Sequence, residues 1–238
     1  MSAGVLYLLP SALGDVGWEA YLPQATRDTA CRLTHFVAEN AKTTRAELKR
    51  IGHPRPLREL AIEQLPEQPT AADIERLLSP LKAGNDLGLQ SEAGCPGVAD
   101  PGALLVRRAH ELGLAIRPLV GPSSLLLALM ASGLDGQRFA FHGYLPQREP
   151  ERSKKITELE RESDKQRQTQ LFIETPYRNA ALFQALLAAC RPATLLCVAA
   201  DLTVATEMIV TRSVADWRKS PPPQLDKRPT VFLLLSAG

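Results

Sequence analysis

The stretch Ser91-Glu92-Ala93-Gly94-Cys95-Pro96-Gly97-Val98-Ala99-Asp100-Pro101-Gly102 follows a short apolar run and precedes a helical pattern that ends at Gly113. Loops from strand to helix usually take about 2–6 residues, so this connection is long. Its small residues would let a ligand approach the backbone, and open α/β sheets bind ligands beyond the carboxyl ends of their strands. We expect a ligand-binding loop here; the alternative is a long turn that binds nothing.

Strands and helices alternate around this loop. Val5–Leu9 is a continuous apolar run, which favours a strand buried on both faces of a parallel sheet, and His35–Ala38 and Ala115–Val120 are further expected strands. Thr44-Arg45-Ala46-Glu47 has capping-box spacing and predicts the start of a helix. Thr70 is the expected N-cap of a second helix, Ala71–Leu81.

The pattern restarts after Gly121 with a helix that Ser123 or Ser124 begins. More strands than helices follow, which predicts a mixed sheet. We therefore expect two α/β lobes, 1–120 and 121–238. The charged stretch Arg148–Arg167 mixes both signs and is predicted to be a solvated helix. The expected strands of this half are Phe139–His142, Leu171–Ile173, Leu195–Ala199, Met208–Val210 and Val231–Leu235.

Composition fits a globular protein with a full core: 238 residues, 45% hydrophobic and 23% charged. The net charge of +2 neither favours nor excludes nucleic acid. The four cysteines form no CxxC pair, so we expect neither a metal site nor a disulfide framework. Because we see no signal peptide and no apolar run near the roughly 20 residues that cross a bilayer, a cytoplasmic location is expected.

Three more motifs stand at predicted strand ends. Val120-Gly121-Pro122-Ser123-Ser124 could hold an anion at a helix start, or simply cap that helix. Phe172-Ile173-Glu174-Thr175-Pro176-Tyr177-Arg178 gathers a carboxylate, a phenol and a guanidinium. Ala199-Ala200-Asp201-Leu202-Thr203 is followed by Glu207. The dinucleotide fingerprint GxGxxG, the P-loop and the nucleophile elbow are absent.

Taken in order, SEAGCPGVADPG, VGPSSLLLALMASGL, FHGYLP, FIETPYR and AADLT resemble the tetrapyrrole methylase superfamily, most of all its branch that methylates a ribose 2′-hydroxyl of small-subunit ribosomal RNA. The resemblance spans nearly the whole chain. It implies a two-lobed fold, with S-adenosylmethionine bound in a cleft between a mainly parallel and a mixed sheet, and a homodimer.

The resemblance also implies cofactor-binding residues. In the first half and at its end these are Pro10, Glu92, Gly94, Cys95, Val98, Ala99, Ser123 and Ser124. In the second half they are Thr175, Tyr177, Ala200, Asp201, Pro229 and Thr230. Glu92 and Cys95 stand where the branch usually has Asp and Thr.

Methyl transfer to a hydroxyl needs in-line geometry, exclusion of water and help with the proton. Four side chains are candidate bases, Glu92, His142, Glu174 and Glu207, while Arg178 could hold a phosphate or carboxylate. We select Glu92, Glu174 and Arg178 as catalytic candidates; each could equally have a structural role. Cys95 lacks a His-Asn partner pattern and is interpreted as a small loop residue.

Basic residues dominate one segment, where Lys42, Arg45, Lys49, Arg50, Arg55 and Arg58 face a single acid, Glu47. This segment could contact RNA phosphates, or it could be a solvated face. Two alternatives to RNA methylation stay open: C-methylation of a tetrapyrrole, and a non-catalytic module that retains the cofactor site.

Overall fold

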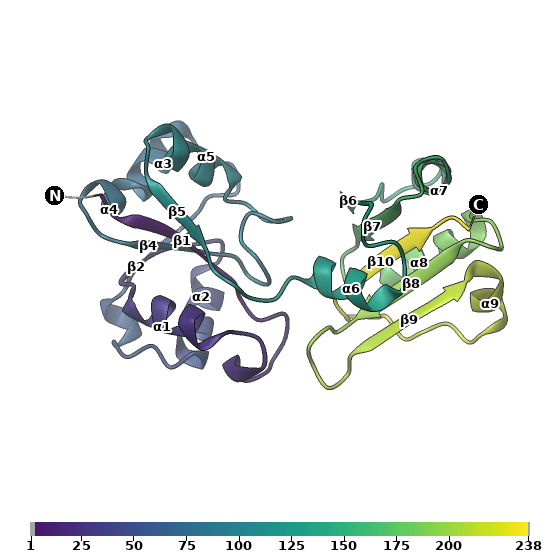
Figure 1. Ribbon diagram of the computed structural model, residues 1–238, viewed down its shortest axis with the longest axis horizontal. Helices are drawn as coiled ribbons and strands as arrows, with labels where there is room; N and C mark the ends of the chain where they lie inside the picture. Colours follow the sequence, from purple (N-terminus) through teal and green to yellow (C-terminus); the bar gives the residue numbers. More distant parts are fainter. Residues whose placement is uncertain (1–2, 238) are drawn as a thin grey trace. The chain divides into compact units, whose positions relative to one another are not determined.

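The computed structural model describes residues 3–237, which form two compact units, the first ending at Ser123 and the second beginning at Ser124. The sequence places the boundary near Gly121. Each unit is built on a five-stranded sheet (Figure 1). Among the described residues, no helix combines the length and apolarity needed to cross a membrane.

The sheet of the first unit has the order β3-β2-β4-β1-β5, and all its neighbours pair in parallel. This confirms the parallel sheet predicted from the sequence. Its strands are β1 (Val5–Leu9), β2 (His35–Ala38), β3 (Ala61–Gln64), β4 (Leu87–Gln90) and β5 (Ala115–Pro118). Its helices are α1 (Gln24–Arg32), α2 (Ala41–Arg50), α3 (Ala71–Leu77), α4 (Ser79–Lys82) and α5 (Ala103–Glu111), with 3-10 turns at Trp18–Ala20 and Leu57–Glu59.

Both faces of this sheet are buried, because alternate strand residues enter two separate cores. Leu6 and Leu89 pack with α3, α4 and α5, whereas Leu9 and Phe36 pack with α1 and α2. Helices therefore cover the sheet on both sides (Figure 1), which leaves its carboxyl edge for the loops.

The sheet of the second unit has the order β6-β7-β10-β8-β9, with β6 parallel to β7 and the other pairs antiparallel. This confirms the predicted mixed sheet. The strands are β6 (Phe139–Tyr144), β7 (Thr169–Ile173), β8 (Leu195–Ala200), β9 (Met208–Ser213) and β10 (Thr230–Leu235). The helices are α6 (Ser124–Ser132), α7 (Glu151–Gln166), α8 (Asn179–Ala189) and α9 (Val214–Lys219).

Three sequence predictions for helices are wrong. Helix α2 does not begin with a capping box at Thr44, because it starts at Ala41 with Asn40 as its N-cap. The helix expected over Ala71–Leu81 ends at Leu77, and a separate short helix follows it, although Thr70 does cap α3 through a capping box with Asp73. The charged helix α7 is not fully solvated, because Ile156 and Leu159 are completely buried in the core of the second unit. These two apolar residues, three positions apart, pack one face of α7 against the core of the second unit.

Candidate functional site

The loop 91–102 lies at the carboxyl edge of the first sheet, where it is fastened to the end of β1. Ser11 and Gly94 exchange backbone hydrogen bonds of 2.8 and 3.1 Å. The Ser11 hydroxyl also donates to the Ser91 carbonyl at 2.9 Å. Because β1 and β4 are adjacent and parallel, Pro10 and Ser91 leave the sheet side by side, and the two loops brace each other.

The middle of this loop turns sharply and stays open. Gly94 and Gly97 have φ of +70° and +80°, and a Cβ at Gly97 would meet no atom within 4 Å. The Cys95 thiol donates to the Pro122 carbonyl at 3.3 Å, and burial raises its pKa, so it is a packed loop residue rather than a nucleophile. Val98 is 48% exposed, and Ala99 has a φ of 63°.

Three carboxylates gather at the same edge. Glu39, which directly follows β2, accepts a hydrogen bond from the Glu92 backbone N–H at 2.9 Å. Burial, followed by the charges of Glu39 and Glu92, raises the pKa of Asp100 to about 6, and a hydrogen bond to Ser91 opposes this. The side chain of Glu92 is exposed and makes no hydrogen bond to any residue in the range 3–237.

In the second unit, Glu174 and Arg178 form an ion pair at the end of β7. The buried Glu174 carboxylate accepts from the Arg178 guanidinium at 2.7 Å and from the Thr175 backbone N–H at 2.6 Å. The hydrogen bond to Glu174, supported by the charge of that carboxylate, raises the pKa of Arg178. These bonds give Glu174 a structural role as the anchor of Arg178, which argues against its action as a base. Tyr177 beside them is 76% exposed.

The end of β8 and the start of β10 meet at the same edge as this pair. Asp201 accepts from the Arg228 guanidinium at 2.7 Å and from the Thr206 hydroxyl at 2.8 Å, and its backbone N–H donates to the Pro229 carbonyl. Ala200 lies opposite Thr230 in the ladder. The backbone N–H of Lys227 donates to Pro176, so the loops after β7 and before β10 touch.

Buried polar atoms without partners lie in these second-unit loops. Within the described part of the chain, Arg178 Nε, Asn179 Oδ1 and Thr203 Oγ1 are buried and make no hydrogen bond. Such atoms are costly unless a ligand or water satisfies them. Asp201 and Thr203 also have φ of 52° and 74°, which is unusual for residues other than glycine.

The structure thus collects the residues named from the sequence into one group in each unit. Pro10, Glu92, Gly94, Cys95, Val98 and Ala99 share the carboxyl edge of the first sheet, and Thr175, Tyr177, Ala200, Asp201, Pro229 and Thr230 share one edge of the second. The division between the units falls between Ser123 and Ser124, and Ser124 begins α6.

Two other candidate bases are occupied by hydrogen bonds. His142 Nε2 lies 2.6 Å from Gln170 Oε1, and a Glu207 oxygen accepts from the Thr203 backbone N–H at 2.8 Å. Sequence reasoning missed Glu39, Asp100 and Arg228. Glu39 could have been found in the same way as the other motifs, because it is a polar residue directly after an apolar strand.

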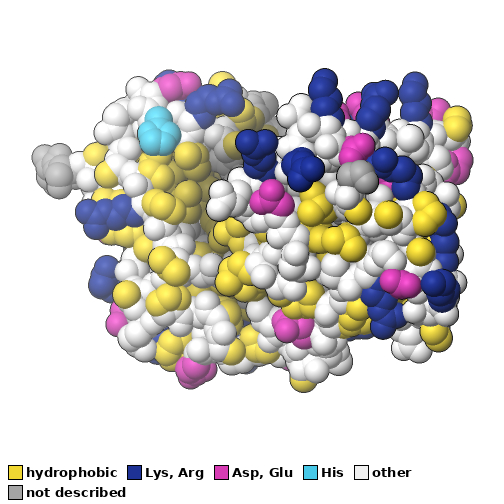
Figure 2. Space-filling model, turned by 45° about the vertical axis from the view of Figure 1, so that its right-hand side comes forward, with side chains coloured by type: hydrophobic (Ala, Val, Ile, Leu, Met, Phe, Trp, Pro, Cys, Tyr) yellow, Lys and Arg dark blue, Asp and Glu magenta, His cyan; other side chains and the backbone are white. Residues whose placement is uncertain are grey.

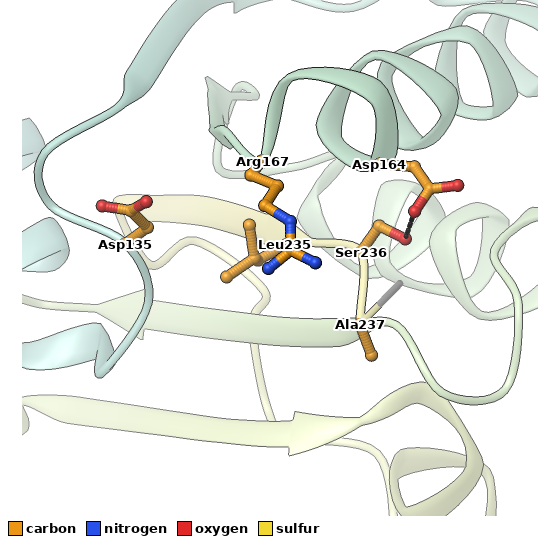
Figure 3. Close-up of a pocket in the computed structure, with 6 residues that line it drawn as sticks. All are labelled: Asp135, Asp164, Arg167, Leu235, Ser236 and Ala237. Atoms are coloured by element: carbon orange, nitrogen blue, oxygen red, sulfur yellow. Dashed lines mark hydrogen bonds between the residues drawn. The ribbon is translucent and has the colours of Figure 1, made fainter.

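A separate cavity of about 200 Å³ lies at the other end of β10 (Figure 3). It is lined by Asp135, Asp164, Arg167, Leu235, Ser236 and Ala237, none of which was predicted as a site residue. Arg191 contacts Asp164 at 3.3 Å and Ser236 at 2.6 Å beside it. Because β10 runs from Thr230 to Leu235, this cavity is at the opposite end of the strand from the loops described above.

The two five-stranded α/β units are also found in a solved methyltransferase. The solved structure of the methyltransferase CobJ has the same fold: its TM-score is 0.63 at 19% identity, with 99% of this chain and 95% of that one covered. The family model Tetrapyrrole (Corrin/Porphyrin) Methylases matches residues 20–217. The chain belongs to this family and is a methyltransferase.

Its curated relatives include proteins named Ribosomal RNA small subunit methyltransferase I. The one from Xylella fastidiosa (strain Temecula1 / ATCC 700964) is 31% identical over 235 residues, which is 99% of this chain and 82% of that protein. The one from Escherichia coli O157:H7 is 30% identical over 208 residues, 87% of this chain and 68% of that protein. Membership in the family implies a methyl-donor cofactor.

Proposed function

We propose that this protein transfers a methyl group from S-adenosylmethionine to a ribose 2′-hydroxyl of small-subunit ribosomal RNA in the cytoplasm. The similarity to relatives named for that rRNA, along 99% of the chain, carries the proposal. The motifs that resemble the RNA-methylating branch agree with it, although Glu92 and Cys95 stand where that branch usually has Asp and Thr.

The residues present suit a donor of this kind. In the first unit, a Cβ at Gly97 would meet no atom within 4 Å, and one at Gly94 would touch only Leu13 at 3.5 Å and the Pro122 carbonyl oxygen at 3.8 Å. We propose that the backbone of this loop and Pro10 contact the methionine part. In the second unit, the loops with Thr175, Tyr177 and Ala200 retain buried polar atoms that lack partners. When bound, the donor supplies a methyl group on a positively charged sulfur.

The acceptor hydroxyl must lose a proton as it attacks. Of the candidate bases, only Glu92 combines an exposed carboxylate with freedom from hydrogen bonds in the described structure. We propose Glu92 as the base. Arg178, held by Glu174, is proposed to bind a phosphate of the acceptor through its guanidinium.

The test of this function is a comparison of acceptors. Purified protein, labelled donor and one acceptor at a time are incubated: small-subunit rRNA transcript, 30S particles, or a polycarboxylate tetrapyrrole. Label in either RNA sample supports the proposal. Label only in the tetrapyrrole would support C-methylation instead, and donor binding without transfer to any acceptor would favour a non-catalytic module.

We also propose that the protein is a homodimer. Leu126 and Met130 lie one turn apart on α6 and are 52% and 80% exposed, and Phe139 on β6 is 44% exposed. Exposed apolar groups of this kind mark interaction surfaces. Light scattering should give twice the monomer mass, and Met130→Glu should reduce it; a monomeric parent at micromolar concentration would contradict the proposal.

A further inference from the structure

Helix α2 begins at the edge of the first sheet that holds the 91–102 loop. Asn40 caps the helix by accepting from the backbone N–H groups of Lys42 and Thr43 at 2.9 and 3.3 Å. The residue before it, Glu39, contacts the backbone of Glu92. The first turn of α2 is therefore fixed next to the loop that carries the proposed base.

The only acid of α2 is buried and already neutralised. Glu47 is 3% exposed, pairs with Arg50 at 2.7 Å and accepts a short hydrogen bond from the Tyr21 hydroxyl. Arg50 also reaches Asp15, in the loop after β1, at 3.1 Å. Burial, followed by Glu47, raises the pKa of Tyr21, so the phenol stays protonated as a donor. Arg50 is thus committed to an internal network.

All exposed charged residues of α2 are therefore basic. Lys42, Arg45 and Lys49 are exposed, and none forms an ion pair with another residue in the range 3–237. Their spacing of three and four residues places them on one face, spread over about 10 Å of helix axis. Arg55 and Arg58, beyond the helix, are exposed as well.

Helix α7 shows how different an ordinary charged surface is. It carries five basic and five acidic residues, so its net charge is zero, whereas α2 carries four basic residues and one acid. In Figure 2, Lys and Arg side chains on the second unit are interspersed with Asp and Glu. Segregation of charge, rather than the number of cations, distinguishes α2.

We propose that Lys42, Arg45 and Lys49 form a phosphate-contacting surface that binds the RNA backbone, while Arg50 takes no part in that contact. This inference rests on the proposed RNA substrate. A basic face without acids attracts the phosphates of a polyanion and does not distinguish between base sequences. It therefore contributes to the affinity for RNA and makes that affinity depend on salt. Because α2 starts beside Glu39, RNA bound along the helix would extend to the edge of the first sheet that holds the 91–102 loop.

The experiment measures the affinity of the full chain for a small-subunit rRNA transcript between 50 and 300 mM salt. The test variant replaces Lys42, Arg45 and Lys49 with Ala, which favours the helix. The control variant replaces the exposed α7 residues Lys154, Arg161 and Lys165 with Ala and loses the same charge. A third variant exchanges Lys and Arg at the three α2 positions and keeps the charge.

Three lost contacts should make the plot of log affinity against log salt shallower by about 2, since each single-strand contact contributes about 0.7. The α7 control and the charge-preserving variant should keep the parent slope. Affinity for S-adenosylhomocysteine should be equal in all four proteins, which shows that the variants are folded.

The inference would be overturned if the α2 variant kept the parent's slope of log affinity against log salt. It would also be overturned if the α2 and α7 variants lost the same amount of slope. If the parent methylates the transcript in those cases, the proposed function stands and only the surface is misassigned. If the parent neither binds nor methylates RNA, the proposed function fails and the inference fails with it. The α2 variant could also bind RNA like the parent but lose the parent's binding to anionic phospholipid vesicles. That result would assign the basic face to a membrane and would overturn the inference.

Discussion

Glu92 is the residue on which the proposed chemistry depends most. Glu92→Gln keeps the size of the side chain and removes the base, so we expect the turnover rate to fall about 10²–10⁴-fold. Affinity for S-adenosylhomocysteine is measured alongside, because the resemblance also implies that Glu92 contacts the cofactor. Glu174→Gln is the matched comparison, because it weakens the anchor of Arg178 rather than removing a base. A Glu92→Gln enzyme with parental turnover would exclude Glu92 as the base.

The carboxyl group of Asp100, in the same loop, should make the stability of the folded protein depend on pH. Its pKa of about 6 in the folded protein lies above the usual value of 3.8, so the folded state binds more protons than the unfolded state between these two values. Stability should therefore fall as pH rises from about 4 to 6, and Asp100→Asn should not show this loss.

Urea denaturation at pH 4, 5 and 7 compares the two proteins. The stability of Asp100→Asn relative to the parent should increase with pH over this range. A difference that stays constant from pH 4 to 7 would mean that the carboxyl has an ordinary pKa.

At the scale of elements, α2 shows where sequence reasoning fails. Thr44 and Glu47 have capping-box spacing, but Thr44 lies inside the helix and its backbone N–H donates to the Asn40 carbonyl at 3.0 Å. Glu47 turns to Tyr21 and Arg50, because burial of a carboxylate requires such partners. Tyr21 is 26 residues away from Glu47 in the sequence, so no local pattern reveals that contact.

The true cap can be tested directly. Asn40→Ala should cost about 1 kcal/mol of stability, because two backbone N–H groups lose their acceptor. Thr44→Ala should cost less, since the Thr44 hydroxyl makes no hydrogen bond in the described structure. Chemical denaturation measures both, and the reverse order would restore the capping box predicted from the sequence.

Substitutions at Arg50 and at its neighbour Lys49 should have different effects on the free energy of unfolding. Arg50→Ala leaves the buried Glu47 without its cationic partner and should cost about 3 kcal/mol. Lys49→Ala touches no ion pair and should lie within about 0.5 kcal/mol of the parent. Similar denaturation midpoints for the two variants would contradict the network as described.

At the scale of the whole molecule, the sequence predicts the two sheets and the position of the candidate loops at strand ends, because both are local signals. The continuous apolarity of Val5–Leu9 indicates a strand buried on both faces, and β1 is such a strand. The pairing of Asp201 with Arg228, 27 residues apart, and the approach of Glu39 and Glu92 to Asp100 depend on tertiary packing. They could not be predicted from spacing.

The central claim is that the acceptor is a ribose 2′-hydroxyl of small-subunit rRNA. It is tested most directly by incubating 30S particles, assembled on unmodified transcript, with the protein and labelled donor, followed by alkaline hydrolysis and mass spectrometry of the products. Methylation of the 2′-oxygen blocks cleavage at that nucleotide, so the account predicts label in an alkali-resistant dinucleotide, which Glu92→Gln forms about 10²–10⁴-fold more slowly. Label on a base, or RNA without label while the protein binds donor, would contradict it.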